Sequence, residues 1–253
     1  MVAEQIAQAP LYLDWVFWSL IVSLLAVVLS QLPPIHILLR KPKLEAEAYS
    51  QMHITHMVGN PNASLHLILS NTGGRILKIQ KIELLFKRGN QDEFSLPAKN
   101  YYQLPGDKET LLLTSFKLKP EEEWAHIINF VNFFSREDDK LFRRLESNLR
   151  TDILDKCDII IDKNEMVTAD EANVLPLAAF FDKKFRWLPG EYELTLRVHT
   201  NPPNIFPDKH FRFVLFESDS EELSGYKDDY KYGFGVSMDT AKHRGVFVTL
   251  SEA

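Results

Sequence analysis

Histidine side chains are the most numerous candidates for metal binding in this sequence, and their spacing does not favour a metal site. Of the eight histidines, His53 and His56 are three residues apart, which places them on opposite faces of a strand. His66 and His199 fall at positions that we expect to face solvent. We therefore predict no metal ion.

The one cysteine and a pair of acidic residues could support nucleophilic or acid–base catalysis. Cys157 lies between Asp155 and Asp158, and neighbouring carboxylates disfavour the thiolate that a nucleophile needs. Asp158 and Asp162 flank three isoleucines and could act as paired acids, although such residues more often lie at turns and strand edges. The chain also lacks the phosphate-binding, dinucleotide-binding, serine-nucleophile and zinc-protease motifs. We expect no catalytic residue and no cofactor.

A tyrosine-rich segment at 225–235 could instead recognise a partner. Tyrosine provides a large contact area at a small entropic cost, and here the rings alternate with charges and glycines. The alternative is an irregular segment whose rings pack on the domain. The candidate contact residues are Tyr226, Tyr230, Tyr232 and Phe234.

An apolar segment near the N-terminus predicts that the chain is attached to a membrane. Residues 15–39 carry no charged side chain, and residues 11–32 would form a helix of about 33 Å, which matches the hydrocarbon core of a bilayer. Pro33 and Pro34 would end it. A buried core helix and a cleaved signal peptide are alternatives, but a signal peptide needs a positive start and a small-residue cleavage site, and both are missing. We predict a single transmembrane helix.

Flanking charge predicts the orientation of this helix. No Lys or Arg precedes it, whereas Arg40, Lys41 and Lys43 follow it. Positive flanks remain on the cytoplasmic side, so we expect the N-terminus outside and the C-terminal domain in the cytoplasm, at the cell (inner or plasma) membrane. The single cysteine fits a reducing compartment.

Small residues form a stripe along the predicted membrane helix. They recur at spacings of four, three and four residues, as in one face of a left-handed helix pair, where small side chains let two backbones approach. We expect this stripe to contact a second copy or the helix of a partner membrane subunit, unless the residues only reflect the usual composition of membrane helices. The stripe consists of Ser19, Ser23, Ala26 and Ser30.

Alternating apolar and polar residues predict a mainly β domain after residue 48. The expected strands cover 64–70, 76–86, 109–118, 191–199, 210–216 and 246–250. In the second of these, Leu77 and Ile79 lie on one phase and Ile82 and Leu84 on the other, which predicts a β-bulge near Gln80.

The arrangement of these strands resembles that of immunoglobulin-like domains at the level of the fold. The segment 188–192 is a Pro-Gly turn before a strand with an inward Tyr192, and the turn at 71–74 joins two apolar strands. The paired cysteines of antibody domains are absent. The resemblance implies an antiparallel β-sandwich and no particular function.

A helical insertion is expected between the early and late strands, at about 120–150. Apolar residues between 124 and 134 fit a helical stripe, and Ser135 is a typical N-cap for a second helix. The first of these helices is either buried or a contact surface for a partner or the bilayer. Its candidate contact residues are Trp124, Phe130 and Phe133.

The sequence therefore predicts a tail at 1–10, a membrane helix at 11–32, a linker at 33–47 and a domain at 48–253. With a net charge of −6 and no concentrated basic face, the chain is a poor candidate for nucleic-acid binding. We expect a single-pass, non-enzymatic scaffold or adaptor subunit that contacts the bilayer and other proteins. The alternatives are a membrane-anchored sensor or ligand-binding module and a hydrolase with an unrecognised site.

Overall fold

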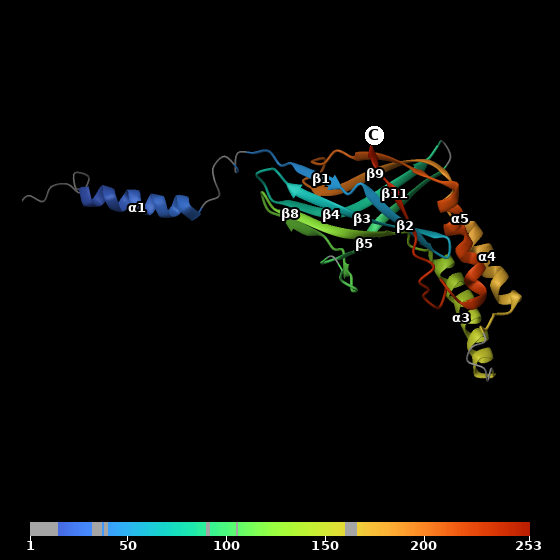
Figure 1. Cartoon of the computed structure of the whole chain (residues 1–253). Helices are drawn as coiled ribbons and strands as arrows, with labels where there is room; N and C mark the ends of the chain where they lie inside the picture. The colour runs from blue at the N-terminus through green and yellow to red at the C-terminus, as the bar shows by residue number, and fades with distance from the viewer. Residues whose placement is uncertain (1–14, 32–36, 38–39, 90–91, 105, 160–165) are drawn as a thin grey trace, which may run out of the picture.

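The computed structural model describes residues 15–31, 37, 40–89, 92–104, 106–159 and 166–253. Figure 1 shows a β domain with helices gathered at one end and the helix α1 (Trp15–Gln31) apart from it at the other. The strands are β1 (Leu44–Ala48), β2 (Gln51–Met57), β3 (Asn60–Asn71), β4 (Leu77–Arg88), β5 (Asp92–Tyr102), β6 (Leu111–Leu112), β7 (Phe116–Leu118), β8 (Glu123–Val131), β9 (Gly190–Asn201), β10 (Lys209–Leu215), β11 (Val246–Thr249) and β12 (Ser251–Glu252).

These strands form one antiparallel sheet that almost closes into a barrel. The order is β11-β2-β3-β8-β5-β4-β9-β10-β12, and β1, β6 and β7 pair with β3, β5 and β4. β5 pairs first with β4 and then, after a register shift near Lys99, with β8. On the opposite side the C-terminal residues pair with β2 as β11 and then with β10 as β12. The expected mainly β, antiparallel fold is confirmed, but the prediction of two separate sheets is wrong, because strands cross between the halves on both sides.

The predicted strand phases match the burial of their side chains. In β9, Tyr192, Leu194 and Leu196 are buried and alternate with solvent-facing residues. The bulge expected near Gln80 is confirmed, since the register of β4 against β9 shifts between Ile79 and Lys81. This shift keeps the apolar side chains on both sides of it inside the barrel.

The interior of the barrel is built around Trp187. Its side chain is fully buried, and its ring nitrogen donates a hydrogen bond of 2.7 Å to the carbonyl oxygen of Thr55. Phe86 packs edge-on against it at 5.3 Å between ring centroids. The Tyr192 hydroxyl donates to the Leu188 carbonyl oxygen at 2.7 Å, so the inward tyrosine predicted after the Pro-Gly turn is confirmed.

The helix predicted at about 120–134 is wrong, because this segment is the strand β8. Ile128 and Phe130 point into the core, and Trp124 continues their period-two pattern as a half-buried residue. The same apolar residues also fit a period of 3.6, so periodicity alone does not distinguish the two structures. The β-branched and aromatic residues favour the strand, in which β8 pairs with β3 and β5.

Helices follow β8 and pack into a lobe at one end of the barrel (Figure 1). The N-cap predicted at Ser135 is confirmed, since its hydroxyl accepts a hydrogen bond of 3.1 Å from the Asp138 amide. The lobe comprises α3 (Arg136–Ile159), α4 (Glu171–Lys184), α5 (Glu217–Gly225) and the short 3-10 helix η2 (Tyr226–Tyr232). Leu149 and Ile153 of α3 pack with Phe181 of α4 and Tyr230 of η2 in a second apolar core.

The helix α1 lies within the predicted span of 11–32, and residues 11–14 and 32 of that span lie outside the described residues. It has 17 residues, and along the described part of the chain we find no helix with both the length and the apolar character needed to cross a membrane. The predicted transmembrane helix is therefore not borne out.

Candidate functional site

The small-residue stripe of α1 is exposed along its length. Three of its hydroxyls donate hydrogen bonds within the helix, from Ser19 to the Val16 carbonyl oxygen, from Ser23 to that of Ser19 and from Ser30 to that of Val27, at 2.7–2.8 Å. Ser19, Ser23, Ala26 and Ser30 are all exposed. Their association with another helix stays a prediction.

The aromatic residues proposed as contact surfaces around β8 differ in exposure. Phe130 is fully buried in the barrel. Trp124 is half-buried and stacks on Phe116, with 4.7 Å between ring centroids. Phe133 is 60% exposed. Of the three, Phe133 alone is mostly exposed.

The tyrosine-rich segment forms η2 and the turn after it. Tyr226 and Tyr230 are buried, whereas Tyr232 and Phe234 are half-buried. The turn is set by Gly233 and Gly235, both at positive φ, and a Cβ on Gly235 would lie 2.6 Å from Nδ1 of His243. These glycines let the segment fold back against the lobe. Tyr226 and Tyr230 therefore pack in the interior of the protein.

The residues considered for chemistry are not brought together. Within the described ranges, no group of three or more His, Cys, Asp or Glu side chains could hold a metal ion. Nε2 of His53 donates to the carbonyl oxygen of Arg244 at 2.5 Å, and Cys157 is exposed on α3. Asp158 belongs to α3, and Asp162 lies outside the described residues.

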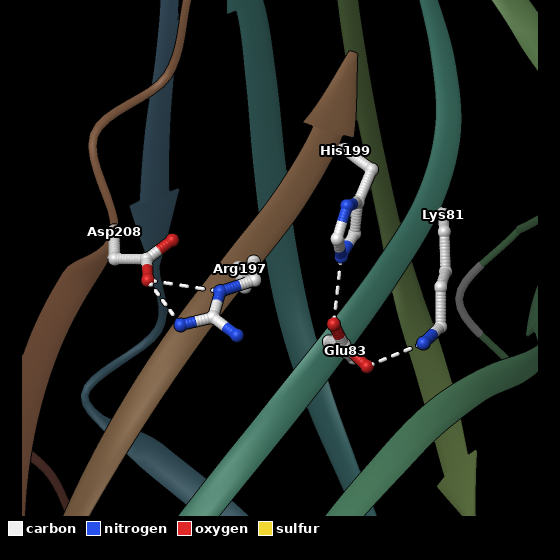
Figure 2. Close-up of polar contacts among 5 residues, drawn as sticks. All are labelled: Lys81, Glu83, Arg197, His199 and Asp208. Atoms are coloured by element: carbon white, nitrogen blue, oxygen red, sulfur yellow. Dashed lines mark hydrogen bonds and ion pairs between the residues drawn. The ribbon is translucent and has the colours of Figure 1, made fainter. Parts of the chain in front are cut away.

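A polar cluster does form on the solvent-facing side of β4 and β9, and Figure 2 shows it. The carboxylate of Glu83, almost entirely buried, accepts hydrogen bonds from Nζ of Lys81 at 2.5 Å and from Nε2 of His199 at 2.7 Å. Arg197 donates twice to one carboxylate oxygen of Asp208, at 2.9 and 2.7 Å. We call these five residues the paired cluster.

Its two hydrogen bonds keep Glu83 ionised and leave it poorly placed to take part in a reaction. Burial alone would raise the pKa of this carboxyl group, but the hydrogen bonds from Lys81 and His199 outweigh burial and hold the pKa below its ordinary value. Both carboxylate oxygens are already occupied by donors. A general base must be able to reach a substrate proton, so this arrangement is suited to joining strands and not to catalysis.

The second polar site is a cavity of about 350 Å³ between the barrel and the helical lobe. We call it the lobe cavity. Its walls come from β2, α3, η2 and the turn that follows η2. The lining residues are His56, Met57, Glu146, Tyr226, Tyr230, Gly235, Val236, Ser237, Met238, Asp239, Thr240 and His243.

Both histidines of the lobe cavity are held by neighbouring groups. Nε2 of His56 donates to the Leu223 carbonyl oxygen at 2.8 Å, and its Nδ1 accepts from the Gly59 amide at 3.1 Å. Burial lowers the pKa of His56 to about 4, so it is neutral at pH 7. His243 lies 3.1 Å from Asp229 through Nε2 and stacks on Tyr226 with 4.1 Å between ring centroids. These rings form a wall of fixed orientation.

Several residues that line the lobe cavity carry polar groups without partners in the described part of the chain. The Tyr230 hydroxyl and the Ser237 hydroxyl are buried and form no hydrogen bond within the part of the chain that the structure describes. Burial also raises the pKa of Tyr230, which keeps it a neutral phenol. Glu146 and Asp239 form no ion pair with a described residue.

Sequence reasoning found only part of this cavity. It singled out Tyr226 and Tyr230 as members of a glycine-rich segment, but it did not find Glu146, Ser237 or Asp239. The glycines at 233 and 235 were the available signal, because they mark a chain reversal. Comparison with known protein families, curated proteins and solved structures finds no match for this chain.

Proposed function

We propose that the chain is a non-enzymatic protein-interaction subunit, attached to a membrane through residues 11–32 with its β domain on the cytoplasmic side. The observation that carries the proposal is the exposed surface of α1. Trp15 is 86% exposed, Leu20 68% and Leu24 65%, and no residue of the helix is charged. Apolar surface of this extent needs a cover, which a bilayer or an apolar partner provides.

The length of α1 determines what the membrane proposal requires. Its 17 residues would cover about 26 Å, short of a hydrocarbon core of about 30 Å. A full span therefore needs residues 11–14 and 32 as well. For these the proposal rests on sequence alone, in which Leu11, Leu13 and Leu32 are apolar and Asp14 is charged. The orientation rests on Arg40, Lys41 and Lys43, which follow the apolar segment.

An apolar groove on the β domain supports the interaction role. It lies where the barrel is nearly closed by its last strands, has a volume of about 610 Å³ and is lined by residues of β10 and β11. Phe216 is 61% exposed there, Phe247 69% and Val214 49%. Together with Phe133, these side chains are among the exposed apolar groups that a protein partner would cover.

Vesicle flotation of the full chain tests the membrane attachment. We expect the wild-type protein to float with vesicles and L24K/V27K to remain at the bottom of the gradient, because a lysine at the centre of a membrane helix costs about 2.5–3.5 kcal/mol. The matched control is L175K, in which lysine replaces a leucine that is 58% exposed on α4. A wild-type protein that does not float, or a double variant that floats equally well, contradicts the proposal.

A second candidate function is that of a ligand-binding module. It is favoured by the lobe cavity, whose volume falls within the range of small-molecule sites. A saturable stabilisation of the full chain by a small molecule would distinguish this function from a purely protein-binding role.

A further inference from the structure

The chain that follows α1 is packed against one turn of the barrel, at 71–75. Ile37 is 6% exposed, and a Cβ on Gly74 would overlap its carbonyl oxygen. The Gly73 amide donates a hydrogen bond of 3.1 Å to the Lys43 carbonyl oxygen. Because glycine has no side chain, the two strands of chain can approach this closely, and the turn is fixed to the linker.

This attachment limits how far the turn can lie from the end of α1. The helix ends at Gln31, and even a fully extended chain from there to Ile37 covers at most about 22 Å. Figure 1 shows α1 at the end of the β domain opposite the helical lobe. A membrane that holds α1 is therefore close to this end of the barrel.

Four basic side chains gather beside this turn, around the paired ends of β4 and β7. Lys78 of β4 lies directly opposite Lys117 of β7 in the strand register. Arg75 precedes β4, and Lys119 follows β7. Lys78 is half-buried and the other three are exposed. We call these four residues the basic surface.

The basic surface has no acidic partner among the residues that the structure describes, since none of its four members forms an ion pair there. Lys81, three residues beyond Lys78 on the same strand, is by contrast paired with Glu83. Like charges directly opposite each other in a sheet are destabilising. An anion from outside the described chain would relieve the repulsion between Lys78 and Lys117.

Acidic residues at the same end of the barrel are mostly engaged within the chain. Glu121 lies 3.4 Å from Arg40, and the Glu122 carboxylate accepts a hydrogen bond of 2.6 Å from the Lys119 amide. Glu123 forms no ion pair with a described residue. Near the basic surface, unpaired positive charge therefore exceeds unpaired negative charge.

An exposed apolar side chain adjoins the basic surface. Ile76 is 56% exposed and directly follows Arg75. An apolar side chain among cations suits the boundary of a bilayer, where apolar groups reach the acyl chains and Lys and Arg meet anionic headgroups. A free phosphate ion would balance the charges but would leave Ile76 uncovered.

We propose that the basic surface binds the headgroups of anionic lipids in the membrane that holds α1, with Ile76 inserted at the headgroup boundary. The inference rests on the proposed membrane attachment. It adds to that attachment the side of the β domain that contacts the bilayer and the class of lipid that this side recognises.

A fluorophore at position 76 of the full chain tests this contact. Cys157 is the single cysteine of the sequence, so I76C/C157S is labelled at position 76 alone with bimane. The protein is reconstituted into phosphatidylcholine vesicles with or without about 30% phosphatidylserine, and a lipid with a nitroxide near its headgroup is the quencher. We expect at least about threefold more quenching in the anionic vesicles than in the neutral ones, because headgroup charge attracts the basic surface.

Charge reversal tests whether the basic surface causes this quenching. In the labelled protein, K117E/K119E should lower quenching in anionic vesicles to the level seen in neutral vesicles. The matched control is K140E/K242E, which reverses two exposed lysines on α3 and on a turn before β11 and changes the net charge equally. It should be quenched as the parent is. Equal quenching of K117E/K119E and the parent, or of the parent in neutral and anionic vesicles, overturns the lipid assignment.

Flotation of the same samples separates this inference from the function on which it rests. A protein that floats with anionic vesicles but is not quenched at position 76 is attached to the membrane, and only the lipid contact of the basic surface is overturned. A protein that does not float overturns the membrane attachment and this inference together. Thermal unfolding of each variant verifies that it is folded.

Discussion

The paired cluster and the lobe cavity are both polar regions of the protein, and they differ in whether their charged side chains are paired. On β4 and β9, Glu83 receives two hydrogen bonds, and Asp208 receives two from Arg197 (Figure 2). In the cavity, Glu146 and Asp239 have no ion-pair partner among the described residues, and the Tyr230 hydroxyl is buried without a hydrogen bond.

This difference separates an arrangement whose polar groups bind one another from one whose polar groups lack partners within the described residues. A polar group whose partners are within the chain has little left to offer a ligand, because binding would have to replace existing hydrogen bonds. A buried group without partners destabilises the fold and is tolerated where another requirement, such as ligand binding, maintains it. The two sites differ in whether their polar groups have hydrogen-bond or ion-pair partners, and not in the number of their charged residues.

Acidification should affect the wall of the lobe cavity before it affects the paired cluster. The pKa of His56 is lowered to about 4 from 6.5, so the unfolded chain takes up a proton first as the pH falls. His56 therefore leaves the free energy of unfolding unchanged above pH 6.5. Between pH 6.5 and 4 it lowers this free energy by up to about 3 kcal/mol. Urea unfolding at pH 7 and pH 5 should show this loss in the wild-type protein and a smaller loss in H56Q.

The paired cluster should respond at lower pH. The pKa of Glu83 is held below its ordinary value, so its contribution is present at neutral pH and is lost as the pH falls through its folded pKa, below 4.5. The His56 prediction is contradicted if the free energy of unfolding falls equally in the wild-type protein and in H56Q between pH 6.5 and 5.

Removing the central carboxylate should destabilise the paired cluster. In E83A, Lys81 and His199 lose their shared acceptor, and we expect a loss of about 2 kcal/mol in the free energy of unfolding at pH 7. The control is E191A, which removes an exposed carboxylate from the same strand pair and should change stability by less than about 0.5 kcal/mol. Equal effects of E83A and E191A would show that the pairing contributes nothing.

Two tyrosines of the lobe cavity provide the smallest and sharpest test. The Tyr226 hydroxyl accepts a hydrogen bond of 2.8 Å from the Gly245 amide, so Y226F should destabilise the protein by about 1 kcal/mol. The Tyr230 hydroxyl has no described partner, so Y230F should be stabilising by up to about 1 kcal/mol. Chemical denaturation compares them, and a loss of stability in Y230F would mean that its hydroxyl is satisfied.

Local patterns predicted much of the barrel but not its closure. The phase change between Ile79 and Ile82 is encoded within a few residues, and the bulge it predicts is present. The helix predicted around Trp124 is instead the strand β8, because the apolar residues of this segment fit both helical and strand periods. The two places where strands cross between the halves depend on pairings between residues far apart in the chain, and no local pattern records these pairings.

The sequence by itself determined the inward-facing side chains of strands such as β9, the position of the bulge, the N-cap at Ser135 and the uncharged character of residues 15–31. Those properties depend on neighbours within one strand or one helical turn. Only the tertiary structure decided that Glu83 would be paired and Glu146 would not. Partner satisfaction depends on groups contributed by separate elements, and residue type alone does not reveal whether such groups meet.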